Sequence, residues 1–252
     1  MVRGGPRLDH SRRKELGQSF QDGGRHYQRV RPGYPVESAR WLIPAGAQDA
    51  LDVGAGTGKF TALLLAMGLE VTAVDPSADM LAQLHAHCPA ATAVPGTAEA
   101  TGLPDATFDV VTVAQAWHWC DPLTASTELA RVLRPQGTLG LVWNQLDTSV
   151  PWVHRLSRIM HAGDVYRPGH KPVVGPEFQG LEGHVTHWQD SVTTEDLMDL
   201  TKSRSYYLRA GESTRAKVLA NLDWYLHEHL GHAPGQELGL PYLTLAWRAT
   251  KA

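Results

Sequence analysis

The 252-residue chain is poor in the features that would place it outside ordinary globular proteins. Its two cysteines, Cys88 and Cys120, form no CxxC pair and no disulfide framework, so we expect a reducing cytoplasm. The net charge of −3 gives no reason to expect a nucleic-acid or membrane partner. No apolar run approaches membrane-spanning length, and the Arg- and Gly-rich residues 1–17 lack the apolar core of a secretory signal.

The composition of the chain is that of a well-packed globular protein. Apolar residues make up 42% and charged residues 19%, a balance typical of globular domains. Strand-like and helix-like segments alternate between residues 45 and 145. This alternation predicts an α/β fold with a doubly wound, mostly parallel sheet and right-handed crossovers.

The strongest local signal is the stretch Asp49 to Phe60. A short predicted strand, 50–53, is followed by three glycines at every second position, and an apolar helix pattern then begins. Glycine has no Cβ, so its backbone can approach a ligand closely. The helix N-terminus behind the turn would supply unpaired N–H groups. The stretch therefore predicts a ligand site at the end of this strand.

Other chemically suggestive residues follow the next predicted strands. Asp75 ends the strand 69–74, Thr97 and Ala98 follow 91–95, and residues 115–119 follow 109–113. Ligands of open α/β sheets bind outside the carboxyl ends of the strands, so these residues should line one crevice. Asp75 lies about 20 residues past the glycines, where an acid can accept from both ribose hydroxyls. The alternative for Asp75 is an Asp-Pro turn that leads into a helix.

The glycine spacing distinguishes two kinds of cofactor. Dinucleotide folds use GxGxxG, where the turn lies against a pyrophosphate. Here the pattern is Asp52-x-Gly54-x-Gly56-x-Gly58, with an acid two positions before the first glycine. An acid at that position suits a ligand with a cationic end and repels a diphosphate.

These motifs together resemble those of the class I S-adenosylmethionine-dependent methyltransferases. Leu51 to Gly58 is similar to motif I, and three later stretches (Asp75 to Met80, Gly96 to Glu99, Leu129 to Gly137) follow in the family's order over residues 45–145. Two further stretches, Phe20 to Pro35 and Trp117-His118-Trp119, resemble the small-molecule branch that includes trans-aconitate-type methyltransferases. The resemblance implies a Rossmann-like methyltransferase fold with a seven-stranded, mostly parallel sheet. It also implies S-adenosylmethionine as cofactor and S-adenosylhomocysteine as product.

The resemblance also implies a set of cofactor-binding residues. Asp52 would hold the amino group of the methionine part, Asp75 the ribose hydroxyls, and Gln115 would close the site beside the sulfonium. Thr97 stands where family members often carry an acid for the adenine amino group, so we expect weaker recognition there. The full set is Asp52, Gly54, Ala55, Gly56, Thr57, Asp75, Pro76, Met80, Thr97, Ala98 and Gln115, with Pro76 or Met80 packing on adenine and Ala98 offering its N–H.

Candidates for the chemical step lie after the fourth predicted strand and in the two ends of the chain. His118 is the candidate general base, because imidazole titrates near neutrality. Its alternative is a histidine that only shapes the pocket, since carboxylate acceptors need no base. Aromatic side chains and arginines, which can clamp a carboxylate, are the candidates for the acceptor pocket. They are Tyr27, Arg31, Trp119, Trp143 and Arg204, and for each the alternative is a surface arginine or a core aromatic residue.

We predict no metal site, although the chain has thirteen histidines. His227, His229 and His232 have a spacing that does not place all three on one helix face, and His184 and His187 should point to opposite faces of a strand.

We predict that the protein transfers the methyl group of S-adenosylmethionine to a small molecule whose accepting group is a carboxylate or a hydroxyl. The alternatives are an NAD(P)-type oxidoreductase and a non-catalytic protein that binds S-adenosylmethionine and regulates a partner. We expect a cytoplasmic monomer or homodimer without a nucleic-acid or membrane partner. We expect residues 1–17 to be a mobile tail and 18–252 one domain. Its parts are an N-terminal cap (18–44), the cofactor-binding core (45–145), acceptor-side helices with a lid loop at 162–183 and a sixth strand at 185–192 (146–235), and the last strand (236–252).

Overall fold

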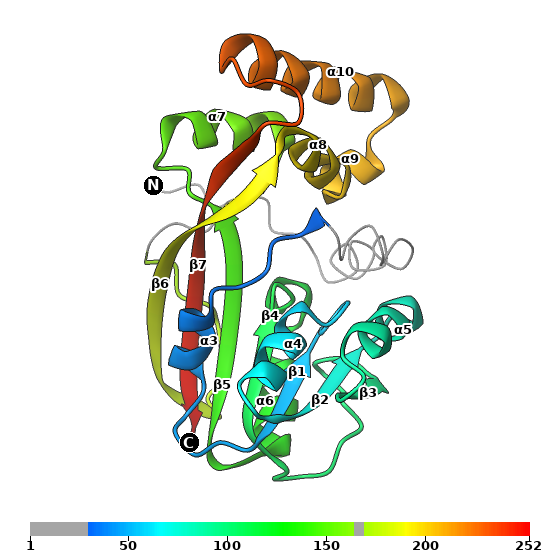
Figure 1. The fold of residues 1–252 in the computed structure, drawn as a ribbon. Coiled ribbons are helices and arrows are strands. Elements are labelled where there is room, and N and C mark those ends of the chain that lie inside the picture. Colours follow the sequence, from blue (N-terminus) through cyan, green and yellow to red (C-terminus); the bar gives the residue numbers. More distant parts are fainter. Residues whose placement is uncertain (1–29, 164–168) are drawn as a thin grey trace.

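A computed structural model describes residues 30–163 and 169–252. Its sheet has seven strands in the order β3-β2-β1-β4-β5-β7-β6. Strand β7 is antiparallel to both of its neighbours, and every other neighbouring pair is parallel (Figure 1). The predicted doubly wound, mostly parallel, seven-stranded sheet is confirmed. Residues 1–17 and Tyr27, to which predictions were attached, lie outside the described residues.

The predicted elements are present, and most differ by a few residues in their bounds. The strands are β1 (Asp49–Val53), β2 (Glu70–Asp75), β3 (Thr92–Pro95), β4 (Phe108–Ala114), β5 (Leu133–Leu146), β6 (Phe178–Thr193) and β7 (Glu237–Lys251). The helices are α3 (Val36–Leu42), α4 (Lys59–Ala66), α5 (Ala78–His87), α6 (Pro122–Val132), α7 (Pro151–Met160), α8 (Thr194–Lys202), α9 (Ser205–Arg209) and α10 (Glu212–Asp223). A short 3-10 helix, η1 (Trp117–Trp119), follows β4, and a π-helical turn, η2 (Trp224–His229), extends α10.

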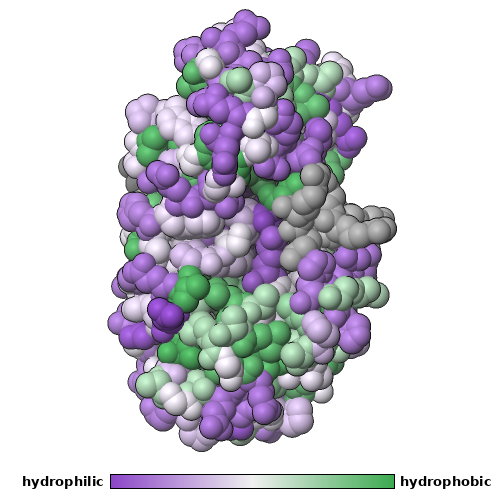
Figure 2. All heavy atoms as spheres, in the orientation of Figure 1, coloured by the Kyte–Doolittle hydropathy of each residue, from purple (hydrophilic) through white to green (hydrophobic). Residues whose placement is uncertain are grey.

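The sheet separates two hydrophobic clusters because successive side chains of a strand point to opposite faces. Helix α6 covers one face, where Leu129 and Val132 pack against Leu51 and Val111. Helices α3, α4 and α5 cover the other face, and the strands contribute mainly small or β-branched side chains there. Figure 2 shows a hydrophobic area on this side, over α4. The two layers hold the carboxyl ends of β1, β2 and β4 at one edge.

Strands β5, β6 and β7 are 14 to 16 residues long and extend beyond that edge. Their extensions carry α7, α8, α9 and α10 as a helical cap, visible at the top of Figure 1. A third hydrophobic cluster, with Leu156 of α7, Leu197 of α8 and Leu222 of α10, forms the core of this cap. The cap thus lies on the side of the sheet where the ligand crevice is predicted.

Two stretches with the composition of loops are strand instead. Residues 134–137, Arg-Pro-Gln-Gly, are typical of a turn that ends a helix, yet β5 already begins at Leu133. The register with β4 shifts between Phe108 and Val110, so the extra residues form a bulge around the proline. Similarly, β6 begins at Phe178, seven residues before the predicted strand, with a shift between Gln179 and Glu182. Proline and glycine at bulges imitate loop composition, which explains both errors.

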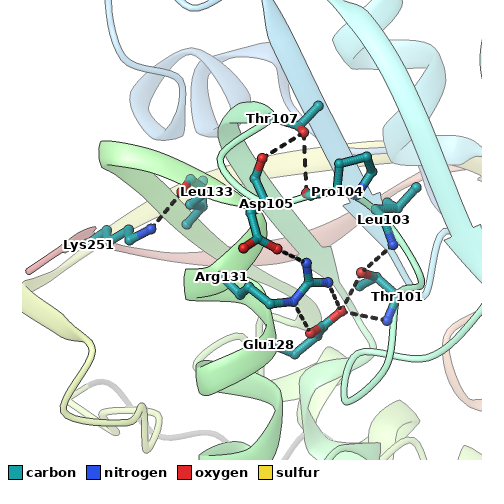
Figure 3. Close-up of polar contacts among 9 residues, drawn as sticks. All are labelled: Thr101, Leu103, Pro104, Asp105, Thr107, Glu128, Arg131, Leu133 and Lys251. Atoms are coloured by element: carbon teal, nitrogen blue, oxygen red, sulfur yellow. Dashed lines mark hydrogen bonds and ion pairs between the residues drawn. The ribbon is translucent and has the colours of Figure 1, made fainter.

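The loop between β3 and β4 is held by a charged network on α6 (Figure 3). Thr101 donates its N–H and its hydroxyl to Glu128 Oε1, at 2.9 and 2.5 Å. Arg131 donates to both oxygens of Glu128 and also pairs with Asp105. Hydrogen bonds from Arg131 are the main cause that lowers the pKa of Glu128 to about 2. The network fixes the segment that follows Thr97 and Ala98.

Among the residues that the structure describes, none of the helices is both long and apolar enough to cross a lipid bilayer.

Candidate active site

The glycine loop is bound to the end of the neighbouring strand. The backbone N–H groups of Gly54 and Ala55 both donate to Val74 O, at 2.8 and 3.1 Å. Gly54 has a φ of +66°, and a Cβ built on it would lie 2.5 Å from the Cβ of Ala116, after β4. Gly56 has a φ of +55°, but its built Cβ would meet nothing within 4 Å. Gly54 therefore allows close packing inside the protein, whereas Gly56 faces open space.

Asp75 lies at the end of β2, beside the loop, as the sequence predicts. Its Oδ2 accepts from the N–H of Gly56 and its Oδ1 from the N–H of Ser77, both at 2.9 Å. Burial raises the pKa of Asp75, and these two hydrogen bonds oppose that shift. Each carboxylate oxygen can accept more than one hydrogen bond, so the side chain retains acceptor capacity toward the crevice. The alternative of a simple Asp-Pro turn is present too, because Ser77 caps α5.

The structure corrects the prediction for Asp52. Its side chain is fully buried beneath α4, where it accepts from Thr61 Oγ1 at 2.7 Å and from Thr112 Oγ1 at 3.0 Å. The backbone N–H of Thr61 donates to it as well. Helix α4 has Gly58 as its N-cap, which offers no side-chain acceptor, so Asp52 supplies one from β1. Asp52 thus stabilises the helix behind the loop instead of facing a ligand's amino group.

The pH dependence of stability should reveal the burial of Asp52. Burial raises the pKa of Asp52 from 3.8 to about 6, so the native state keeps a proton that the unfolded state loses between these values. The stabilisation by the protonated form is complete below pH 3.8 and is lost as pH rises through 6. Asp52→Asn should abolish this loss, on the order of 3 kcal/mol between pH 4 and 7.5. Urea unfolding of both proteins at these pH values measures it, and equal pH slopes would refute the assignment.

The predicted adenine-side residues lie at the ends of β2 and β3. Met80 is buried in the first turn of α5, whereas Pro76 is exposed. Thr97 and Ala100 exchange two backbone hydrogen bonds, at 3.1 and 3.2 Å, in a tight turn after β3. Ala98 is buried within that turn. The turn therefore lies beside Asp75, whose carbonyl oxygen accepts from the N–H of Gly96 at 3.3 Å.

Asn144, near the end of β5, is a node that the sequence analysis missed. Its carbonyl oxygen accepts from Gln115 Nε2 at 2.7 Å, and its Nδ2 donates to Gly33 O at 2.7 Å. Its Oδ1 accepts from Thr244 of β7 at 2.6 Å. Asn144 directly follows the strand-like stretch 138–143, so the same strand-end reasoning could have found it. It ties the segment before α3 to Gln115, the residue predicted to close the site.

His118, Trp119 and Trp143 are brought together after β4. The indole Nε1 of Trp143 donates to His118 Nδ1 at 3.4 Å, and the rings of His118 and Trp119 have centroids 4.3 Å apart. Burial lowers the pKa of His118 to about 4, so its imidazole is neutral at pH 7. Because an indole N–H only donates, Nδ1 is the acceptor and Nε2 carries the proton. Trp143 is buried in the core, which was the alternative to a place in the acceptor pocket. It acts on the site only through its hydrogen bond to His118.

The two arginines predicted for the acceptor pocket meet near the start of α9. Arg31 donates through Nη2 to Ser203 O at 2.8 Å, and Arg204 donates through Nη1 to Ala162 O at 2.9 Å. Arg204 Nε is buried without a hydrogen-bond partner. Both guanidinium groups donate to backbone carbonyl oxygens. Arg204 lies in the helical cap and Arg31 lies before α3, and their contact with an acceptor stays a prediction.

The predicted lid loop is only partly described. Its end is held against α6, because Gly175 N–H donates to Ser126 Oγ at 2.8 Å and Trp117 Nε1 donates to Val173 O at 3.0 Å. This end is therefore packed against the body of the domain. In the described part of the chain, no three His, Cys, Asp or Glu side chains gather as metal ligands. His227 hydrogen-bonds to His232 O instead.

The edge of the sheet thus offers a cradle that fits an adenosine-containing cofactor. The open space at Gly56 admits close contact with backbone, and Asp75 beside it is a partly satisfied hydroxyl acceptor. The turn at Thr97 and Ala98 borders the same edge, next to Asp75. A dinucleotide also places a ribose at such an acid, so Asp75 alone does not distinguish the two cofactors; the glycine spacing does.

Several known proteins are similar to this chain. Residues 51–141 match the family model of a methyltransferase domain. An uncharacterised methyltransferase of Mycobacterium tuberculosis is 44% identical over 242 residues, which cover 95% of this chain and 98% of that protein. A proposed type II methyltransferase from Anaeromyxobacter dehalogenans has a solved structure with a TM-score of 0.65 and 28% identity, covering 88% of this chain and 97% of that one. The malonyl-[acyl-carrier protein] O-methyltransferase of Erwinia billingiae is 37% identical over 144 residues, half of this chain and 57% of that protein.

Proposed function

The chain belongs to the class I S-adenosylmethionine-dependent methyltransferases, and we propose that it methylates a carboxylate oxygen of a small organic acid. The trans-aconitate-type branch, which the motifs resemble, is part of the same proposal. When bound, S-adenosylmethionine supplies an activated methyl group on a sulfonium. Neither the oxidoreductase alternative nor a non-catalytic role has support from a relative described above.

The state of His118 is the observation that carries the proposal. A general base that works at neutral pH needs a pKa near 7 and a free lone pair. His118 has a pKa of about 4, and its Nδ1 already accepts from Trp143 Nε1. It is therefore a poor base and a good donor through Nε2. Phenols and protonated amines must lose a proton before they attack a methyl group, whereas a carboxylate at pH 7 is already a nucleophile.

The surrounding residues suit the same acceptor. A carboxylate needs donors that hold it in place, and correct alignment of the reacting groups contributes up to about 7–11 kcal/mol. Arg204 has a buried Nε without a hydrogen-bond partner, and His118 has its Nε2–H. We assign both to the acceptor, with Arg31, Trp119 and Tyr27 as further wall residues. The Erwinia relative, named for O-methylation of a malonyl group, supports a carboxylate as the acceptor class.

The cofactor roles form part of the proposal. We assign Asp75 to the ribose hydroxyls, the backbone of residues 54–57 to the methionine part, and Thr97 and Ala98 to adenine. Pro76 and Met80 would pack on the ring, and Gln115 closes the site through Asn144. Isothermal titration should show binding of S-adenosylhomocysteine and no binding of NADH; the reverse result would favour an oxidoreductase.

A methyl-transfer screen tests the acceptor class directly. Small di- and tricarboxylic acids, phenols and amines are offered at equal concentration at pH 7, and release of S-adenosylhomocysteine is measured. The acids should react at least about tenfold faster than the other classes. A faster reaction with a phenol or an amine would overturn the carboxylate proposal and leave the family assignment intact.

We expect His118→Ala to lower turnover about tenfold with the best acid, while the affinity for S-adenosylhomocysteine stays unchanged. The reason is the loss of one hydrogen-bond donor, worth about 1–1.5 kcal/mol. His118→Asn, which keeps a side-chain N–H donor, should retain more activity. Because the imidazole titrates near pH 4, kcat of the wild type should be flat from pH 6 to 8. If kcat of the wild type instead rose through pH 7 and kcat of His118→Ala did not, His118 would be the general base.

A further inference from the structure

The helical cap contains a cavity that shares no residue with the candidate active site. It lies between α7, α9 and α10 and has a volume of about 470 Å³. In Figure 1 these helices form the top of the molecule, beyond the carboxyl edge of the sheet. The cavity is lined by Arg155, Arg158, Ile159, His161, Tyr206, Thr214, Lys217, Val218 and Asn221. Three of these are cationic and none is acidic.

Helix periodicity explains why these cations share one cavity. Arg155 and Arg158 are three residues apart on α7, so they lie on one face. Lys217 lies on α10 between Thr214 and Asn221, which follow the i, i+3, i+4, i+7 spacing of a single face. The cores of both helices, Leu156 and Leu222, pack in the same cluster beneath. The packing of the cap thus brings three positive charges to one opening.

The three cations lack the partners that other basic residues have. Arg131, Arg134 and Arg248 each form an ion pair with a carboxylate. In the part of the chain described by the structure, Arg155, Arg158 and Lys217 form no such pair within 4.0 Å. Arg155 lies instead over the rings of Trp224 and Tyr225, 5.3 and 5.1 Å from their centroids. Like charges gathered in one place repel each other, and a bound anion relieves this repulsion.

Two features favour an organic anion over a bare one. The rings of His161 and Tyr206 are stacked, with centroids 3.8 Å apart and planes 20° apart, which forms a flat aromatic wall. Ile159 and Val218 add apolar surface to the lining. A phosphate has several acceptor oxygens for arginine and lysine donors, and an attached ring or chain could pack on the aromatic wall. We propose that this cavity binds the phosphate group of a small organic molecule.

The test uses the full-length protein saturated with S-adenosylhomocysteine, so that the cofactor cleft cannot take up the nucleoside part of the probe. Uridine monophosphate, uridine and inorganic phosphate are titrated by calorimetry at 50 and 300 mM salt. Uridine monophosphate should bind, inorganic phosphate should compete with it, and uridine should not. Binding should weaken at the higher salt concentration because the attraction is electrostatic. Equal binding of uridine and its phosphate, or no binding of either phosphate compound at millimolar concentration, would overturn the proposal.

Paired variants locate the site. The double variant Arg158→Gln/Lys217→Gln should bind uridine monophosphate at least about tenfold more weakly, since it removes two of the three charges. Arg158 and Lys217 are exposed, and circular dichroism with S-adenosylhomocysteine binding checks that the fold is unchanged. Arg40→Gln is the matched control, because it removes an exposed arginine from the last turn of α3, as Arg158 lies in the last turn of α7. Equal affinity of the double variant and the control would refute the assignment to this cavity.

Discussion

Gly54→Ala is expected to lower the free energy of unfolding by about 3 kcal/mol. The added Cβ would lie 2.5 Å from Ala116 Cβ, far inside van der Waals contact, so the loop or the end of β4 must move. Overpacking of this kind costs about 1–3 kcal/mol, and the left-handed backbone at φ +66° adds about 1 kcal/mol for alanine. For a chain of this size the melting temperature should fall by roughly 6–12 °C.

Gly56→Ala is the matched control, with the opposite pattern of effects. Its φ of +55° imposes a similar backbone strain, but its Cβ meets nothing within 4 Å. The melting temperature should therefore fall by only about 2–4 °C. Under our proposal the same Cβ points to where the cofactor lies, so affinity for S-adenosylhomocysteine should drop strongly. Thermal unfolding measures the loss of stability in each variant, and calorimetry measures the affinity for S-adenosylhomocysteine. A Gly56→Ala protein with normal affinity would show that the cofactor does not bind against this loop.

Asp75→Asn is expected to weaken S-adenosylhomocysteine binding by about 100-fold or more. Two hydroxyl groups that donate to a carboxylate contribute about 1.5–3 kcal/mol each, and about 1.4 kcal/mol corresponds to tenfold in affinity. The amide cannot replace this acceptor, because its NH₂ group would also face an N–H donor, either of Gly56 or of Ser77. Part of the loss therefore comes from a displaced loop and part from the missing ribose contact.

A control on the same helix distinguishes the site from a general loss of charge. Asp79→Asn makes the same chemical change at an exposed position in the first turn of α5, and its affinity should equal that of the wild type. Melting curves of both variants without ligand report how much of the Asp75 effect is structural. If Asp75→Asn bound S-adenosylhomocysteine normally, the ribose assignment would be wrong, and Asp75 would serve only to hold the loop and the start of α5.

Asp52 and Asp75 show where inference from the sequence reaches its limit. Both are acids at the ends of buried parallel strands, and motif resemblance assigned both to the cofactor. Asp75 lies at the edge, in contact with the loop. Asp52 lies one residue earlier than the last residue of β1, and the parallel register opposite Thr112 directs its carboxylate beneath α4. The local sequence does not show that Gly58 leaves α4 without a capping side chain, or that Asp52 accepts hydrogen bonds from Thr61 in the first turn of that helix.

His118 shows the same limit in its chemistry. Its place after β4, beside Trp119, was evident from the sequence. Its protonation was not, because that depends on burial and on a hydrogen bond from Trp143, 25 residues away on β5. Asn144 was missed although it directly follows a strand-like stretch, since only the assembled sheet brings Gly33, Gln115 and Thr244 around it.

The sequence by itself determined the sheet, the succession of its first five strands and their helices along the chain, and the edge at which a ligand site is predicted. These follow from local hydrophobic periods, caps and glycines, which act over a few residues. Only the tertiary structure decided the burial of Asp52 beneath α4, the state of His118 and the grouping of Arg155, Arg158 and Lys217 in the cap. Each of these depends on contacts between segments far apart in the chain, whose burial and charge no local pattern records.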